Sequence, residues 1–292
     1  MRYRISHLTR YDYAEPVSLC HSLVHLKPRQ GPHQRCLSTQ LRIDPWPAVN
    51  REHEDFFGNR VNYFSIQQSH ETLEVTAVSE VEVTTPSPPD PVGTPAWETA
   101  RDLLCELRTP TMAGKRVFTL PTPQVPLDPA ARAFAAASFT PGRPLLDATG
   151  DLMRRIYNEF SYDPHFTTIA TPVAEVMEHR RGVCQDFAHV AIAGLRGLGL
   201  AARYVSGYLE TLPPPGQVKL QGSDASHAWF AVLVPGLGWV DFDPTNNLSP
   251  GEQHITAAVG RDFHDVTPMR GIFYGGGSHD LTVAVDVNRV DE

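Results

Sequence analysis

The chain has 292 residues, of which 41% are hydrophobic and 20% are charged. This composition supports a sizeable core and excludes wholesale disorder, and the length allows one large domain or two ordinary ones. A formal net charge of -8 disfavours a basic nucleic-acid-binding face, so we expect no nucleic-acid partner. No apolar run reaches about 18 residues, so we expect no membrane partner. The first twenty residues lack the apolar stretch of a signal peptide, which favours a cytoplasmic location.

The first 85 residues are predicted to be rich in β-strands. Apolar and polar residues alternate in several short runs, and in one of them Leu73, Val75 and Ala77 share a face. Turn-forming pairs separate the runs, as at Asp44-Pro45 and Gly58-Asn59. Short strands with this punctuation predict an antiparallel, sandwich-like N-terminal domain over residues 1–85.

A proline-rich segment follows over residues 86–127. It holds nine prolines, which favours a semi-rigid connector over a flexible one. One short helix is predicted inside it, because Thr94 can cap a helix and Pro95 suits its first position.

Residues 128–292 are predicted to form an α+β domain, since helical patterns come first and strand patterns follow. Asp128-Pro129 predicts a helix start, and a longer helix is expected to begin at Cys184 and to stop near Gly199. Beyond this point alternating runs such as HAWFAVLV and LTVAVDVNRV predict strands.

Cys184 is the candidate nucleophile of this domain. It stands in the first turn of its predicted helix, where the backbone N–H groups are unpaired and the helix dipole is positive. Both features favour a thiolate, although most free cysteines are small buried residues without a chemical role. The other cysteines lie in strand or mid-helix patterns, and for them the buried, inert interpretation is favoured: Cys20, Cys36 and Cys105.

His227 and Asp243 are the candidate partners of this thiol. They lie at the far ends of two strand patterns joined by a hairpin signal, Pro235 to Gly238. Pairing centred on residue 235 places the two side chains directly opposite each other, and other odd loop lengths place them one diagonal apart on the same face. The three residues would form a triad in which Cys184 attacks, His227 takes its proton and Asp243 orients the imidazole.

Several blocks of the chain resemble the transglutaminase-like superfamily. The stretch RGVCQDFAHVAIAGLRGLGLAARYVSGYL (181–209) is similar to its cysteine block, and HAWFAVLVPGLGWVDFDPTNN (227–247) to its histidine and aspartate strands. YDY, Pro28-Arg29 and DFFGNRV resemble the β-rich N-terminal region of bacterial members, and GRDFHDVTPMRGIFYGGG (260–277) resembles their C-terminal block.

The resemblance implies a papain-like thiol core and carries Cys184, His227 and Asp243 over as its catalytic triad. The implied chemistry is acyl transfer from an amide of a peptide or protein substrate, with transamidation, deamidation and peptide hydrolysis all open. The backbone N–H of Cys184 is one expected oxyanion donor. Tyr162 is a candidate for the second, although a core or helix-capping tyrosine is the commoner interpretation. By family analogy, a peptide-ligase partner in bacteria is conceivable.

No cofactor is expected. His21 and His25 have the i, i+4 spacing of helical metal ligands, but their segment is predicted to be a strand, where that spacing separates them. No third ligand with zinc spacing follows, so no metal is predicted. The alternative function is a non-catalytic transglutaminase-like scaffold that binds a partner through its β-domain. Loss of a triad residue would favour that alternative, but all three residues are present.

Overall fold

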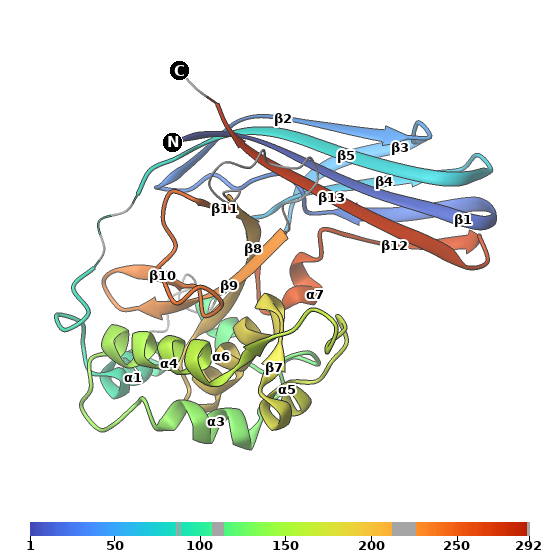
Figure 1. Ribbon diagram of the computed structural model, residues 1–292. Helices are drawn as coiled ribbons and strands as arrows, with labels where there is room; N and C mark the ends of the chain where they lie inside the picture. The colour runs from blue at the N-terminus through green and yellow to red at the C-terminus, as the bar shows by residue number, and fades with distance from the viewer. Residues whose placement is uncertain (86, 88, 107–113, 212–225, 291–292) are drawn as a thin grey trace, which may run out of the picture.

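The computed structural model describes residues 1–85, 87, 89–106, 114–211 and 226–290. Figure 1 shows a β-rich region beside a region in which helices pack against a smaller sheet. Among the described residues the first region is a seven-stranded antiparallel sheet. Its strands are β1 (Arg2–Val24), β2 (Gln34–Asp44), β3 (Val49–Glu54), β4 (Arg60–Ile66), β5 (His70–Val83), β12 (Met269–Gly275) and β13 (His279–Arg289).

The large sheet curls because its central strand is interrupted. The register between β1 and β5 jumps between Asp12 and Val17, where Pro16 cannot donate a ladder hydrogen bond. The first arm of β1 pairs with β5 and β13, and the second arm pairs with β4 and β12. Side chains of both arms share one core, in which Leu73 of β5 and Phe64 of β4 are buried. The expected sandwich is thus one curled antiparallel sheet.

The end of the chain completes this sheet. The sequence pattern placed residues 269–289 with the catalytic core, whereas β12 and β13 pair with β1 along both of its arms. Val285 and Val287 of β13 are buried with Tyr3 and Ile5. The N-terminal region therefore depends on strands that lie more than 240 residues further along the chain.

The second region holds helices packed on a four-stranded antiparallel sheet of order β10-β9-β8-β11. The side chain of Asp128 accepts a hydrogen bond from the Ala131 N–H at 2.7 Å, which confirms the predicted helix start. The sheet strands are β8 (Ala202–Leu209), β9 (Ser226–Val234), β10 (Gly238–Phe242) and β11 (His254–Gly260). The helices of this region are α3 (Pro129–Ala136), α4 (Leu145–Glu159), α5 (Val173–His179), α6 (Cys184–Gly197) and α7 (Phe263–Val266).

Shorter elements complete the described chain. The helix expected in the connector is α1 (Trp97–Glu106). The Thr94 hydroxyl, which was expected to cap it, donates to the Pro91 carbonyl and accepts from the N–H of Leu146 in α4 at 3.2 Å. The remaining short elements are η1 (Val117–Thr119), β6 (Ser161–Tyr162) and β7 (Arg181–Gly182). Within the described ranges, every helix is too short or too polar to cross a bilayer.

Two side-chain amides join the regions along the outer edge of β11. The Asn59 amide donates to the Val259 carbonyl at 2.8 Å and accepts from its N–H at 2.9 Å. The Gln34 amide makes the same pair of bonds with Thr256, at 2.8 and 2.7 Å. Each amide satisfies backbone groups of an edge strand that would otherwise remain unpaired. These bonds place the loop at residues 29–34 over the small sheet.

Candidate active site

Cys184 is the first residue of α6, as predicted, and its side chain is half-buried. The start of this helix is fixed by Asp186, whose carboxylate accepts from the Val183 N–H at 2.8 Å and from the Thr167 hydroxyl at 2.7 Å. This role of Asp186 is not predictable from local sequence, because its partner Thr167 lies in a preceding loop. The N–H of Cys184 precedes the first intrahelical hydrogen bonds and remains available to an oxyanion.

Because Gly182 has no side chain, the Asp186 carboxylate can pack directly against the backbone at the start of α6. A Cβ at this position would lie 2.7 Å from the Asp186 Oδ2 and 2.8 Å from its Cβ, closer than real contacts allow. Gly182 is also paired with Tyr162 in a short parallel ladder between β6 and β7. The backbone therefore approaches the Asp186 side chain directly, two residues before the thiol.

His227 and Asp243 meet on one face of the small sheet, although not in the expected register. The pairs Val234↔Gly238 and Phe242↔Phe230 centre the hairpin on residue 236, because three residues form its loop. The two side chains are thus diagonal neighbours on that face, as expected when the hairpin is centred one residue beyond residue 235. The His227 Nε2 lies 2.7 Å from the Asp243 Oδ2, and this bond leaves Nδ1 for a partner on the other side of the ring.

The Asp243 carboxylate is fully buried and saturated with donors. Its Oδ1 accepts from the N–H groups of Thr245 and Asn246 at 2.9 and 3.2 Å. Its Oδ2 faces the His227 Nε2, the Asn246 Nδ2 at 2.7 Å and the His254 Nε2 at 3.1 Å. A carboxylate held by this many donors stays ionised and fixes the rings around it.

The charges of His227 and Asp243 stabilise each other. Burial alone lowers the pKa of His227, but hydrogen bonds to Asp243 and Cys184, with the charges of both groups, raise it from 6.5 to about 10. Burial alone raises the pKa of Asp243, but its hydrogen bonds to His227 and His254 bring it well below its usual range. The arrangement thus favours an imidazolium held between the Asp243 carboxylate and the Cys184 sulfur.

The structure brings Tyr162 to the same site. Its side chain is 58% exposed, which contradicts the core interpretation. Partial burial of the side chain, followed by the charges of Cys184 and Asp186, raises the pKa of Tyr162. Trp229 is fully buried, with its ring centroid 6.0 Å from that of His227, and it excludes water from one side of the imidazole.

Sequence reasoning missed His254 and Asn246, which complete the shell around Asp243. His254 begins β11, and its ring packs edge-to-face on Trp229 at a centroid distance of 5.3 Å. Gly207 permits this contact, because a Cβ there would lie 2.6 Å from the Trp229 indole. No local pattern singles out His254, since its approach to Asp243 depends on the pairing of β11 with β8. Asn246 follows the aspartate in the DPTNN block but looks like a turn residue.

Three of these side chains also form a possible ligand set for a metal ion. One atom from each of His227, Asp243 and His254 lies within 4.8 Å of the others. The two Nε2 atoms, however, stand 2.7 and 3.1 Å from one carboxylate oxygen. Adjacent ligands of a tetrahedral zinc site with bonds of about 2.0 Å stand about 3.3 Å apart. The two nitrogen–oxygen distances therefore fit hydrogen bonds between the imidazoles and the carboxylate better than a bound zinc ion.

Two family models match the chain. Residues 3–82 match the bacterial transglutaminase-like N-terminal region. Residues 132–244, which include Cys184, His227 and Asp243, match the transglutaminase-like superfamily.

Similar proteins cover nearly the whole chain. An uncharacterized protein of Mycobacterium tuberculosis is 43% identical over 296 residues, which cover 98% of this chain and 92% of the relative. An uncharacterized protein of Mycobacterium leprae is 31% identical over 297 residues, with 99% of each chain covered. A crystal structure from Cytophaga hutchinsonii, named provisionally as a cysteine protease, has a TM-score of 0.76 at 21% identity and covers 100% of this chain and 91% of its own. That likeness shows a shared fold.

Proposed function

Because the chain belongs to the transglutaminase-like superfamily, we propose that it is a thiol acyl-transfer enzyme acting on amide bonds of peptide or protein substrates. The observation that carries this proposal is the hydrogen bond of 2.7 Å between the His227 Nε2 and the buried Asp243 carboxylate, beside a cysteine at a helix start. The core would then work as a papain-like thiol site.

In the first half of the reaction, the Cys184 thiolate attacks the amide carbonyl carbon and forms a tetrahedral oxyanion. The N–H of Cys184 is suited to donate to that oxyanion, and the exposed hydroxyl of Tyr162 is the candidate second donor. Collapse of the intermediate breaks the C–N bond. The leaving amine or ammonia takes its proton from the His227 imidazolium, and a thioester remains on Cys184.

In the second half, water or a primary amine attacks the thioester. His227 takes the proton of the nucleophile through Nδ1, while Asp243 holds Nε2. The C–S bond breaks, and the thiolate–imidazolium pair is restored. Attack by water gives deamidation or peptide hydrolysis, and attack by an amine gives transamidation. A peptide-ligase partner, suggested by family analogy, would supply a peptide amide.

The test compares wild-type protein with Cys184→Ala on a panel of glutaminyl peptides with hydroxylamine as the acceptor. Ammonia release, hydroxamate formation and peptide cleavage are measured together by mass spectrometry, so each fate of the thioester is detected. We expect at least one product from wild-type protein and none from Cys184→Ala, which removes only the sulfur. Equal yields from both proteins would overturn the proposal.

A further inference from the structure

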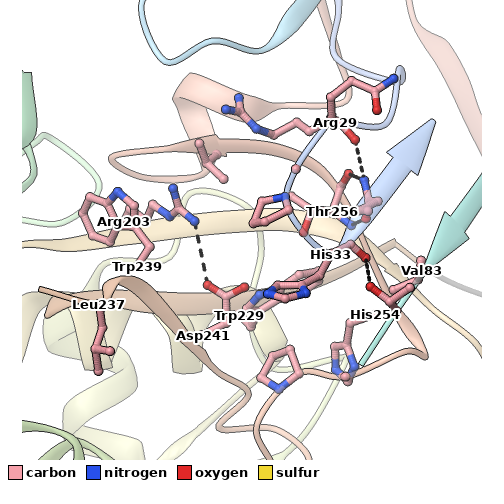
Figure 2. A pocket seen from close by; sticks show the side chains of 18 residues that line it. Arg29, His33, Val83, Arg203, Trp229, Leu237, Trp239, Asp241, His254 and Thr256 are labelled. Atoms are coloured by element: carbon pink, nitrogen blue, oxygen red, sulfur yellow. Dashed lines mark hydrogen bonds and ion pairs between the residues drawn. The ribbon is translucent and has the colours of Figure 1, made fainter. Parts of the chain in front are cut away.

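The outer edge of the large sheet, unlike the cavity beside the small sheet, leaves backbone groups unpaired among the described residues. In the cavity, which is lined by the loop at residues 29–34, Figure 2 shows Arg203 and Asp241 facing each other as an ion pair of 3.9 Å. The edge is formed by β13, drawn in red in Figure 1, which pairs only with β1 among the described strands. An edge strand exposes N–H and C=O groups on which another extended chain can pair.

The register identifies the backbone groups of β13 that face outward. The Ala14 N–H donates to the Ser278 carbonyl at 2.9 Å, in the register that β1 and β13 keep without interruption. Hydrogen-bonded pairs alternate along an antiparallel ladder, so even-numbered residues of β13 bond to β1 and odd-numbered residues direct their N–H and C=O groups away from it. Over residues 279–283 these outward groups belong to His279, Leu281 and Val283, and none of them bonds to another described residue.

The side chains at this edge continue an apolar row that begins in the core. Val285 is buried against the small sheet, and Leu281 and Val283 lie on the same face because alternate residues of a strand share a face. Their side chains are nevertheless 54% and 50% exposed. A strand added at this edge would place its own apolar residues beside them and cover the row.

The other face of the same edge is acidic. Asp280 lies directly opposite Asp12 of β1, and like charges in this position repel each other. The nearby Arg10 is already engaged, since its Nη2 lies 2.8 Å from Asp12 and its Nη1 lies 3.7 Å from Glu74. Within the described ranges Asp280 has no ion-pair partner, so a cation on an added strand would complete it.

We propose that the edge of β13 over residues 279–283 binds an extended basic segment of a peptide or partner protein as an added antiparallel strand. Main-chain hydrogen bonds to His279, Leu281 and Val283 hold the segment, and its alternate side chains select it. Apolar residues of the segment cover Leu281 and Val283, and a lysine or arginine stands opposite Asp280. The net charge of -8 of the whole chain favours a basic segment as well.

This interaction goes beyond the proposed function, because strand pairing needs no reaction at Cys184. The edge belongs to the large sheet, whereas Cys184 begins α6 in the other region. Cys184→Ala should therefore bind the same segment as wild type does. Failure of the strand pairing and failure of the proposed chemistry are thus distinguishable.

The test uses the synthetic peptide Ac-TVTVKVT-NH₂, whose antiparallel alignment places valines opposite Leu281 and Val283 and its lysine opposite Asp280. The matched peptide Ac-TVTVEVT-NH₂ changes only the charge. Binding to the full chain is followed by fluorescence anisotropy of the labelled peptides at low ionic strength, because salt screens exposed charges. We expect saturable binding of the lysine peptide and roughly fivefold weaker binding of the glutamate peptide.

Amide hydrogen exchange, measured by NMR with the lysine peptide at saturation, tests the strand pairing itself. The N–H groups of Leu281 and Val283 should exchange at least about tenfold more slowly, because they gain hydrogen bonds. The N–H of Thr282 already faces β1 and should change little.

Two variants separate the backbone from the charge. Val283→Pro removes an outward N–H without removing a bond to β1, and it should weaken binding about tenfold. Asp280→Lys should reverse the preference, so that the glutamate peptide binds more tightly. Asp102→Lys makes the same change of charge on α1, outside the large sheet, and should leave the preference unchanged. The dispersion of each variant's amide spectrum reports whether it is folded.

Four results would contradict the proposal. Absence of saturable binding by the lysine peptide would show that the edge receives no such strand. Equal effects of Asp280→Lys and Asp102→Lys would reduce the preference to net charge. Unchanged exchange at Leu281 and Val283 would place the peptide elsewhere. A concentration-dependent dimer that protects the same N–H groups without peptide would assign the edge to a second copy of this chain.

Discussion

Replacement of Asp243 by asparagine should disable the triad while preserving shape. In the wild-type structure Oδ1 accepts from two backbone N–H groups, and Oδ2 faces two imidazoles and the Asn246 amide. An asparagine has only one oxygen, so its NH₂ group must point at donors in either orientation. If the NH₂ takes the Oδ2 side, the His227 Nε2 must lose its proton to accept. The remaining proton then sits on Nδ1, which cannot take a proton from the thiol.

The size of the effect follows from the lost charge-assisted hydrogen bond. Such a bond contributes about 1.5–3 kcal/mol, which corresponds to a roughly 10- to 150-fold smaller population of the thiolate–imidazolium pair. When the triad aspartate of a serine protease is replaced by asparagine, kcat falls by about 10⁴, and this loss is an upper bound here because a thiol ionises more readily than a hydroxyl. We therefore expect Asp243→Asn to slow alkylation of Cys184 at pH 6 by one to two orders of magnitude.

The assay is the rate of iodoacetamide labelling of Cys184, followed by peptide mapping. Asp147→Asn is the matched control, because Asp147 lies on α4 and pairs with Arg143, away from the triad. It should label within about twofold of wild type, an ordinary surface effect. An Asp243→Asn variant that is folded and labels as fast as Asp147→Asn would refute the orienting role of Asp243.

Three further predictions follow from the same contacts. Cys184 should be labelled much faster than Cys36, whose Sγ lies 3.3 Å from a threonine hydroxyl and has no histidine partner among the described residues, and comparable native rates would contradict this. Gly182→Ala should lower the free energy of unfolding by about 1–3 kcal/mol and slow labelling, because the new Cβ collides with Asp186, and an unchanged melting temperature would argue against the close approach. The raised pKa of His227 stabilises the fold fully below pH 6.5 and ceases to do so as pH rises through about 10; in urea unfolding, the stability difference between wild type and His227→Gln should shrink over that interval, and a constant difference would count against the pair.

Much of the fold was predictable from local patterns. Alternation along β5 predicted the buried face of Leu73 and Val75, and both are buried. Asp128-Pro129 predicted a helix start because capping is local chemistry. The facing of His227 and Asp243 was predictable to within one diagonal, since side chains two residues apart in a strand share a face and a loop with an odd number of residues, such as the three found here, keeps them on that face.

Other features depend on contacts that no local pattern encodes. The alternation along β13 is that of any strand, and nothing in β12 or β13 specifies β1, more than 240 residues away, as their partner. His254 reaches Asp243 only because β11 lies beside β8. The side chain of Cys105 lies outside the described residues, and its expected inertness remains a prediction.

The most direct measurement of the central claim is acylation of the protein by p-nitrophenyl acetate, which needs no knowledge of the natural substrate. The account predicts a burst of one equivalent of nitrophenol per chain, with the acetyl group mapped to Cys184. His227→Gln should slow that burst, and Cys184→Ala should abolish it. A burst of equal rate in His227→Gln, or an acetyl group mapped to another residue, would contradict the assignment of Cys184 and His227 as nucleophile and base.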